Sequence, residues 1–337
     1  MINTGPPARG LTPAICSHVR FSSTKCHFCW RLKSAARSLH CVDLHDFAIA
    51  RSQGGAFKAQ QARQSVRWEH LRDLQEAGLV IRESRTVFRL ADAGDDLSSR
   101  LARAELAMGR PLIACHHTAA DLHRFGVLPD PSLHVTTVGA RSIKPPPLVV
   151  VHQMTLRSPV VRMAGLLVVD PADTAIDVAA AARSIDVLAV LDAALASGVR
   201  PQQLCDALDR ARRLRGIVEV RGQLCRASPK AESPMESRSR YRIYEAGLPE
   251  PELQIMVPIP TGGFRALDMG WRRARIGLEF DGQEFHAGDG SLDRDRQRGS
   301  DLISAGWTVV HITARDVYRN PERFTGILRD LLHQRQS

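Results

Sequence analysis

The sequence predicts a multidomain α/β (α+β) fold, and three observations support this prediction. The chain has 337 residues, more than one ordinary domain needs. Hydrophobic residues make up 44% of it, as is typical of chains that bury a core. Apolar periodicity along residues 233–334 indicates a helix, three strands, a helix, a strand and a helix, whereas residues 42–94 indicate three helices and two short strands. We therefore expect two dissimilar folded units, separated by a further α/β region.

The first C-terminal helix is expected over residues 233–246. Ser233 is a good N-cap, Pro234 suits the first helical position, and Glu236 completes a capping box. The elements expected after it are strands at residues 253–259, 264–269 and 276–280, a helix at 293–305, a strand at 308–313 and a helix at 321–334.

The hairpin formed by the second and third of these strands brings acidic residues together. If it is symmetric about Arg273 and Ala274, Asp268 lies opposite Glu279, with Cβ atoms about 4.5–5.5 Å apart. Asp281 lies on the same face as Glu279. Like charges so close destabilise a sheet unless a cation neutralises them, and oxygen ligands suit a divalent ion. The alternatives are solvated strand-end acids, or a register shifted by one residue that moves Asp268 to the other face.

Five segments between residues 232 and 332 carry a resemblance to a known family: ESPMESR, AGLPEPELQ, LDMGW, LEFDGQEFH and DRQRGSDLISAGWTVVHIT. In this order they resemble the Vsr-like (very-short-patch-repair-like) endonuclease domain of the PD-(D/E)XK superfamily, above all its uncharacterised bacterial branch, domain of unknown function 559. The resemblance implies a restriction-endonuclease-like αβββαβα domain over residues 226–337. It also implies hydrolysis of DNA with bound Mg²⁺ or Mn²⁺.

The resemblance assigns site residues position by position. Glu236 on the first helix, Asp268 on the second strand and Glu279 on the third match the superfamily's metal-binding acids. Asp281 stands where the superfamily usually has lysine, and we expect it in the metal shell. His286 matches a histidine of the similar Vsr phrase and is expected to act as a general base or acid. The missing lysine keeps an alternative open, a transcriptional regulator or antitoxin-like protein whose nuclease fold is a scaffold without turnover.

Residues 42–94 predict a winged helix-turn-helix domain. Helices are expected at residues 42–53, 56–64 and 66–78, with strands on either side of a turn at residues 83–85. The segment resembles the N-terminal DNA-binding domain of AbiEi-type antitoxins, in which the third helix enters the major groove. The resemblance implies DNA contacts from the third helix and the wing, by Arg67, His70, Arg72, Arg82 and Arg85. The alternatives are a solvated arginine face and a protein-binding module.

Residues 95–225 predict an α/β middle region that supports the two ends. Helices are expected at residues 97–108, 112–127 and 174–196, with strands at 133–138, 148–154 and 165–170. His116, His117 and His123 lie on the second helix. Asp121 is the one carboxylate at ligand spacing, so we expect packing or capping roles there rather than a metal site.

The charge of the chain favours DNA as a partner. Its formal net charge is +10, and arginine supplies most of the cations. Arg296 and Arg298, on the helix after the acidic hairpin, are expected to contact phosphates, whereas the run at residues 210–215 is either a phosphate-binding strip or a solvated helix end. A toxin or another protein is the further partner expected. No apolar run approaches the ~20 residues that span a bilayer, and no P-loop or dinucleotide motif is present, so neither a membrane nor a small-molecule cofactor is expected.

Cysteine usage and the N-terminal arm complete the predictions. The seven cysteines are odd in number and irregularly spaced, which favours a reducing cytoplasm over a disulfide framework. Residues 1–41 contain no acidic residue and are expected to be a disordered basic arm, or the product of an upstream start codon. Cys26 and Cys29 lack the second well-spaced pair that a zinc knuckle needs.

Overall fold

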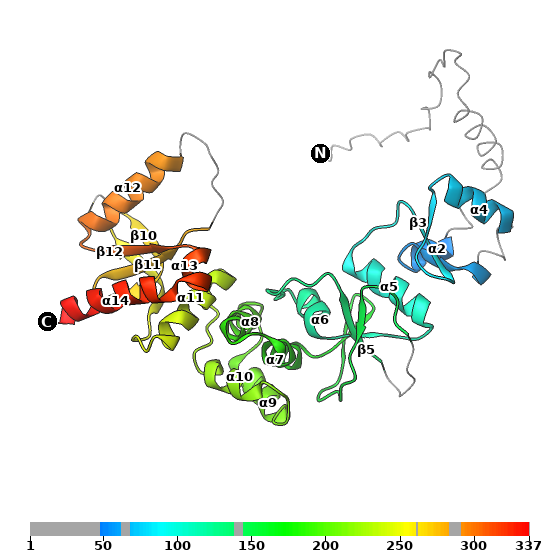
Figure 1. Ribbon diagram of the computed structural model, residues 1–337, viewed down its shortest axis with the longest axis horizontal. Coiled ribbons are helices and arrows are strands. Elements are labelled where there is room, and N and C mark those ends of the chain that lie inside the picture. The colour runs from blue at the N-terminus through cyan, green and yellow to red at the C-terminus, as the bar shows by residue number, and fades with distance from the viewer. Residues whose placement is uncertain (1–47, 62–67, 138–143, 261, 283–290, 337) are drawn as a thin grey trace, which may run out of the picture.

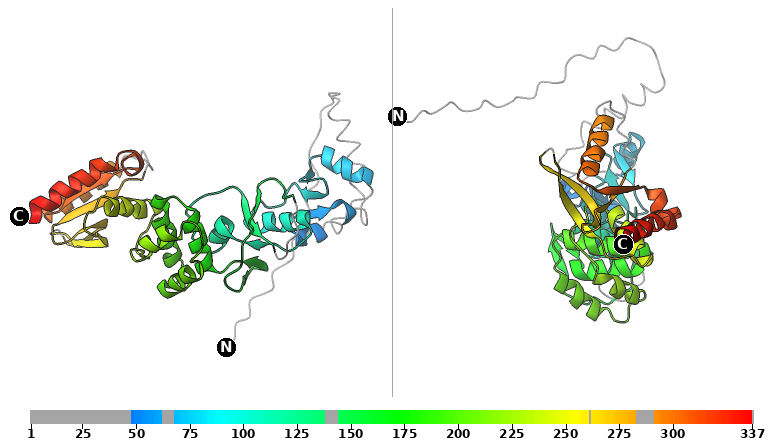
Figure 2. Two further views of the ribbon diagram at one scale, coloured as in Figure 1. Left: turned by 60° about the horizontal axis from the view of Figure 1, so that its bottom comes forward. Right: turned by 90° about the vertical axis from the view of Figure 1, so that its left-hand side faces the viewer.

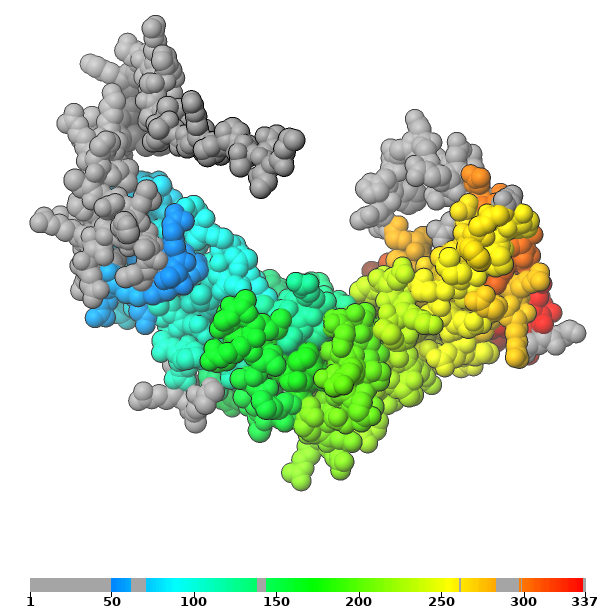
Figure 3. All heavy atoms as spheres, turned by 180° about the vertical axis from the view of Figure 1, so that it is seen from behind, coloured from blue at the N-terminus to red at the C-terminus, as the bar shows by residue number. Residues whose placement is uncertain are grey.

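The computed structural model describes residues 48–61, 68–137, 144–260, 262–282 and 291–336 (Figure 1). These residues form a mixed α/β molecule with three sheets, which follow one another along its long direction (Figure 2). The space-filling view shows an arc with the N-terminal unit and the C-terminal sheet at opposite ends (Figure 3). Among the helices of the described ranges, none combines the length and the apolar composition needed to cross a bilayer.

In the N-terminal unit, the described residues include helices α2 and α4 and a three-stranded antiparallel sheet in the order β1-β3-β2. Phe57 and Phe88 pair across the sheet and pack with Leu71 and Leu74 of the second helix in a small core. The elements are α2 (Ala48–Ser52), β1 (Ala56–Lys58), α4 (Trp68–Glu76), β2 (Val80–Arg82) and β3 (Val87–Leu90).

The helix expected at residues 56–64 is wrong at its start. Gly54 and Gly55 adopt positive φ values of 66° and 79° and turn the chain into β1, where Ala56 and Phe57 are buried against β3. The helix begins only after this strand, at residue 59. The turn at residues 83–85 lies between β2 and β3, as predicted. Residues 42–47 of the first expected helix and residues 62–67 lie outside the described residues.

The middle region contains a five-stranded mixed sheet in the order β6-β5-β4-β8-β7. The helix expected at residues 112–127 is wrong in its first part, because Ile113 and Ala114 are buried between β5 and β8 as a short strand. Strand β7 was not predicted. The elements are α5 (Leu97–Met108), β4 (Ile113–Ala114), α6 (His116–Leu122), β5 (Leu133–Thr136), β6 (Val149–Val151), β7 (Val161–Met163) and β8 (Leu166–Val168).

The single helix expected at residues 174–196 is two helices, α7 (Pro171–Ala181) and α8 (Ser184–Ala196). Ala182 and Arg183 have extended backbone between them, and the Arg183 side chain pairs with Asp186 in the first turn of α8. The break turns α8 so that it packs against both α7 and the following domain. Two further helices complete this region, α9 (Pro201–Arg210) and α10 (Ile217–Leu224).

The C-terminal domain follows the predicted order of one helix, three strands, a helix, a strand and a helix, with α13 as an addition. Its sheet has the order β12-β11-β10-β9, in which β11 and β12 are parallel and the other neighbours antiparallel. The elements are α11 (Pro234–Glu245), β9 (Glu252–Pro258), β10 (Phe264–Trp271), β11 (Ile276–Phe280), α12 (Ser291–Ser304), β12 (Thr308–Ile312), α13 (Ala314–Arg319) and α14 (Pro321–Gln336).

Helices cover both faces of this sheet (Figure 1). On one face, Ile243 of α11 and Phe324 and Leu328 of α14 pack against Met269 and Leu278 of the hairpin. On the other, Leu302 of α12 packs with Ile255, Leu267 and Trp307. Burial on both faces leaves few sheet positions for polar side chains, so those that carry them need an explanation.

Buried ion pairs fasten the C-terminal domain to the middle region. On α8, the Asp192 carboxylate accepts hydrogen bonds from Ser237 Oγ at 2.6 Å and from Arg240 of α11 at 3.4 Å. Asp186, six residues earlier on α8, pairs with Arg238 at 2.8 Å. Helix α11 is therefore held in place by α8 as well as by its own sheet.

Candidate functional site

A row of polar side chains crosses the C-terminal sheet. Met269 pairs with Leu278, and continuing this register by one residue places Asp268 opposite Glu279, as the symmetry about Arg273 and Ala274 predicts. The same reasoning places Gln254 of β9 beside Asp268, and Glu279 pairs directly with His311 of β12. We call Gln254, Asp268, Glu279 and His311 the polar row.

The two acids at the centre of the row are held differently. Asp268 is half-buried, and its Oδ2 accepts a hydrogen bond from the Phe280 backbone N–H at 2.8 Å. Glu279 is buried, with His311 Nδ1 3.9 Å from its Oε2. Because Phe280 directly follows Glu279, the bond to Asp268 fixes the distance between the two strands where both acids stand.

Glu236 approaches the row from α11. The Ser233 hydroxyl accepts a hydrogen bond from the Glu236 N–H at 3.2 Å, as predicted for an N-cap. The Glu236 carboxylate accepts from the Glu232 N–H at 3.1 Å, a different partner from the one a regular capping box provides. Burial raises the pKa of Glu236, and the negative charge of Asp268 adds to this effect. The carboxylates of Glu236 and Asp268 thus interact at this place on the sheet.

Gln254 is a functional candidate that sequence reasoning missed. Its Nε2 donates to Glu236 Oε2 at 3.2 Å, which joins the polar row to α11. The Gln254 backbone has a φ of 52°, a left-handed conformation that costs about 1–3 kcal/mol in a residue with a side chain. Such strain persists only where the surrounding structure imposes it, and it often marks functional sites.

His311 is the second candidate that was missed, although its position in an otherwise apolar strand is a signal. Its Nδ1 lies 3.2 Å from Asp281 Oδ1. Asp281 is exposed at the end of β11, so its carboxylate faces His311. A histidine therefore lies beside the exposed Asp281 and the buried Glu279.

The structure brings the acids near one another without closing them into a tight cage. In the described ranges, the ligand atoms of Glu236, Asp268 and Glu279 do not form a group that lies within 4.8 Å of one another. His286, the expected proton-transfer residue, lies outside the described residues.

The residues expected to contact DNA are only partly described. Arg72 on α4 is exposed and pairs with Glu76 at 3.3 Å. Arg82 donates to the backbone carbonyls of Ser84 and Arg85, so its side chain stabilises the β2–β3 turn, where Arg85 is exposed. The residues whose side chains lie outside the described parts are Arg67, His70, Arg296 and Arg298.

Helix α12, which carries Arg296 and Arg298, is fixed against the sheet. Arg265 of β10 donates to Asp301 Oδ2 through Nε at 3.0 Å and through Nη2 at 2.6 Å. These two hydrogen bonds hold α12 close to β10. Arg265 precedes Asp268 by three residues in this strand. The helix is thereby placed beside the polar row.

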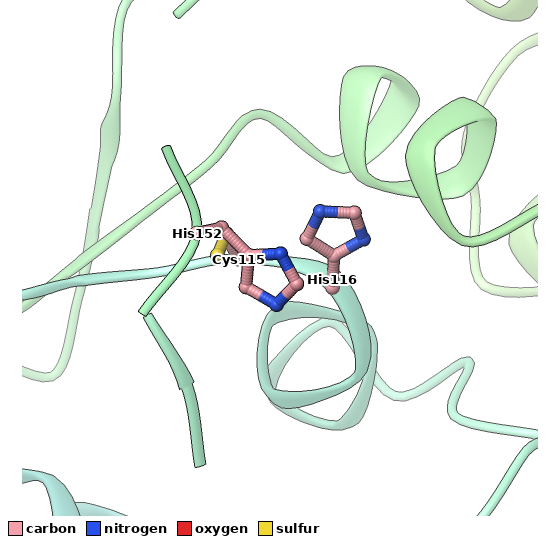
Figure 4. A group of neighbouring side chains, drawn as sticks. All are labelled: Cys115, His116 and His152. Atoms are coloured by element: carbon pink, nitrogen blue, oxygen red, sulfur yellow. The ribbon is translucent and has the colours of Figure 1, made fainter. Parts of the chain in front are cut away.

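A separate cluster in the middle region was not predicted. Cys115, His116 and His152 have ligand atoms that all lie within 4.8 Å of one another (Figure 4). The prediction had grouped His116 with His117 and His123 instead. His123 Nε2 donates a hydrogen bond to the Val169 carbonyl at 2.8 Å, in agreement with a packing role.

Comparisons with known proteins place the chain among uncharacterised relatives. No known family model matches it. It is 37% identical over 229 residues to the uncharacterized protein Rv2248 of Mycobacterium tuberculosis strain ATCC 25618 / H37Rv, and equally to the uncharacterized protein MT2308 of strain CDC 1551 / Oshkosh. The match covers 68% of this chain and 84% of each relative.

Proposed function

This chain belongs to the family of these uncharacterized Mycobacterium tuberculosis proteins, and we propose that it binds DNA and hydrolyses its phosphodiester bonds with a bound Mg²⁺ or Mn²⁺ ion. The observation that carries the proposal is the polar row, reinforced by Glu236 from α11. Burial and the charge of Asp268 raise the pKa of Glu236, which means that an ionised carboxylate is unfavourable there. The acids gathered at this place therefore do not stabilise the sheet by themselves. A divalent cation is the partner that oxygen donors of this kind suit.

The order of elements supports the same proposal. A helix, three antiparallel strands, a helix and a parallel fourth strand agree with the core of the restriction-endonuclease-like domain that the sequence resembles. In that arrangement Asp268 and Glu279 would hold the ion, and Glu236 or Asp281 would complete its shell. Such an ion would lower the pKa of a water molecule and stabilise charge on the phosphate.

The chain's own residues then position the ion and move protons. Gln254 orients the Glu236 carboxylate, and Phe280 N–H orients that of Asp268. His311 holds or accepts a proton beside Glu279 and Asp281, with His286 as the second proton-transfer residue. In hydrolysis the water oxygen bonds to phosphorus, the bond from phosphorus to the leaving oxygen breaks, and the leaving oxygen gains the proton that water loses.

The N-terminal unit is proposed to place the protein on DNA. Helix α4 and the β1-β3-β2 sheet support the winged-helix hypothesis, in which α4 reads the major groove and the β2–β3 turn lies along the backbone. Arg72 and Arg85 are exposed at these two places.

A cleavage assay tests the proposal. Supercoiled plasmid and a mismatched duplex are incubated with the full chain and Mg²⁺ or Mn²⁺, with a chelator as control. We expect metal-dependent nicking that Asp268→Asn and Glu279→Gln abolish. Glu252→Gln is the matched control, because this exposed acid of the same sheet pairs with Arg272 instead.

His311→Gln measures the proton-transfer role separately. A positioned general acid or base contributes about 100- to 10,000-fold to a rate, so we expect a loss in that range with unchanged metal affinity. A His311→Gln enzyme as fast as the wild type would remove His311 from the mechanism.

A second candidate function is that of a DNA-binding regulator without turnover. Two observations favour it: Asp281 stands in place of a lysine, and Asp268 already accepts a hydrogen bond from Phe280 N–H. Folded protein that binds DNA but leaves it intact with either metal would support the regulator and contradict the nuclease.

A further inference from the structure

The middle region gathers one thiol and several imidazoles at the edge of its sheet. Cys115 follows β4, His116 begins α6 and His152 follows β6, and their ligand atoms all lie within 4.8 Å of one another (Figure 4). Cys115 is fully buried, whereas both histidines are half-buried. The set therefore has one side closed by the core and one side open to solvent.

A hydrogen-bonded chain sets the orientation of His152. His134 Nε2 lies 3.1 Å from Asp130 Oδ2, and His134 Nδ1 lies 2.9 Å from His152 Nε2. The backbone N–H of Ser132 lowers the pKa of Asp130 to about 2, so its carboxylate is ionised and only accepts. With both rings neutral, His134 donates to Asp130 and accepts from His152 Nε2–H. His152 Nδ1 then carries a lone pair, and a carboxylate behind a histidine is the usual support of a metal ligand.

The backbone at His116 is strained in a way that serves this cluster. Its φ is 44°, although it carries a side chain and occupies the first position of α6. This conformation costs about 1–3 kcal/mol and persists only where neighbours impose it. It places the His116 ring on the His152 ring, with centroids 4.0 Å apart.

A buried carboxylate near the cluster lacks a partner for one of its oxygens. Asp177 of α7 is 2% exposed, and Oδ1 pairs with Arg157 at 2.6 Å, but no hydrogen bond reaches Oδ2. Asp177 lies close enough to Cys115 for its charge to act on the thiol. A buried carboxylate oxygen without a hydrogen-bond partner beside these ligand atoms indicates an environment that favours an added cation.

We infer that Cys115, His116 and His152 bind a Zn²⁺ ion, with His134 and Asp130 as the supporting chain behind His152. One sulfur and two imidazole nitrogens are the ligands that zinc prefers, and Mg²⁺ avoids such a set. Three protein ligands leave the fourth position for water. On binding, the S–H bond of Cys115 breaks, its proton goes to solvent and a Zn–S bond forms, while one of the two stacked rings turns so that its nitrogen faces the ion.

This site is independent of the proposed nuclease. Its ligands come from the sheet of the middle region, and no residue of the polar row takes part. The alternative to a zinc site is a hydrogen-bonded histidine cluster that has only a packing role. It accounts for the contact between His134 and His152, but not for the strain at His116 together with the unpartnered oxygen of Asp177.

Cobalt spectroscopy on the full chain tests the inference. Metal is first removed with a chelator, and Co²⁺ is then titrated in as a coloured substitute for Zn²⁺. We expect one Co²⁺ per chain, a thiolate-to-cobalt charge-transfer band in the near ultraviolet, and intense visible bands of four-coordinate cobalt that added Zn²⁺ removes. Folded wild type that shows no charge-transfer band would overturn the inference.

Variants decide which residues bind. Cys115→Ser should lose the charge-transfer band, and the matched control Cys205→Ser, at an exposed position on α9, should keep it. His134→Gln should weaken Zn²⁺ binding about 10- to 100-fold, because it removes the support of a ligand and no ligand itself. A band retained in Cys115→Ser would overturn the assignment. If that variant does not fold, His152→Gln decides the same question, since tight Zn²⁺ binding in it contradicts the site.

Discussion

The polar row of the C-terminal sheet and the Cys115 cluster of the middle sheet are built in opposite ways. In the row, Asp268 and Glu279 face each other across a single hairpin, only eleven positions apart in sequence. In the cluster, Cys115 and His152 come from strands that are separated by β5 and by many intervening residues. The two acids of the row offer oxygen donors, whereas the cluster offers sulfur and nitrogen.

This difference predicts two separate metal preferences in one chain. Carboxylates on neighbouring strands suit a hard divalent cation that keeps several waters. A thiol and imidazoles that are fixed by a carboxylate behind them suit zinc. The two groups share no side chain, yet α8 and α11 connect the regions that carry them, so each can be tested for its effect on the other.

The largest expected effect comes from breaking this connection. Asp192→Ala leaves Arg240 buried without its partner, and such a loss destabilises a protein by about 3–5 kcal/mol. The free energy of unfolding, measured in urea, checks the value. Asp209→Ala is the control, since its exposed pair with Arg212 should contribute within about 0.5 kcal/mol. Equal effects of the two changes would show that α8 and α11 are joined only weakly.

Metal exchange is the next test, because it compares the two sites directly. Zn²⁺ at 100 times its Kd should raise the free energy of unfolding by about 2.7 kcal/mol. Cys115→Ser should cancel this gain and Asp268→Asn should not. Stabilisation by Mg²⁺ should show the reverse dependence in thermal unfolding experiments. If Asp268→Asn removed the response to both ions, the two sites would not be independent.

How far the sequence predicts each site follows from the same contrast. The hairpin register depended only on local symmetry about Arg273 and Ala274, so the meeting of Asp268 and Glu279 could be predicted. Gln254 and His311 required the pairing of strands β9 and β12, which no local pattern encodes. His116 was considered together with His117 and His123 and expected to pack or cap, because its neighbours Cys115 and His152 are brought to it only by the order of strands in the sheet.

The fold shows the same limit. A capping residue located α11 closely, because Ser233 acts within one turn of the helix that it begins. Tertiary burial overrode local periodicity elsewhere. Ala56 and Phe57 lie in a strand because they pair with β3. The helix expected at residues 174–196 breaks at Ala182, and α8 packs against α11 after this break. Short buried segments are therefore where prediction from periodicity fails.

The pH dependence of stability offers a smaller effect that belongs to the polar row alone. Burial raises the pKa of Glu236 in the folded protein above its ordinary value of 4.5, so the folded state binds a proton more tightly than the unfolded one. Stability without metal therefore falls as pH rises from 4.5 through the raised pKa. Glu236→Gln should remove this slope and make the metal-free protein more stable at pH 7, as measured by denaturant unfolding at several pH values.

Two controls define the meaning of that result. Glutamine keeps an oxygen that can accept from the Glu232 N–H, so loss of this hydrogen bond is not the cause of any change. Glu245→Gln, on the exposed end of the same helix, should leave the pH profile as it is. A Glu236→Gln protein that is less stable than the wild type at pH 7 would contradict the account of a carboxylate crowded by burial and by Asp268.

The smallest expected effect concerns the N-terminal unit and leaves both sites untouched. Arg72→Ala on α4 removes one exposed cation, so stability should change by less than about 0.5 kcal/mol. If Arg72 contacts a phosphate, the slope of log affinity against log salt concentration should fall by about 1. Arg51→Ala on α2, which breaks an exposed pair with Asp92, is the matched control. Equal salt slopes for the two variants, measured by fluorescence anisotropy, would place DNA away from α4, and the N-terminal unit would then be a protein-binding module.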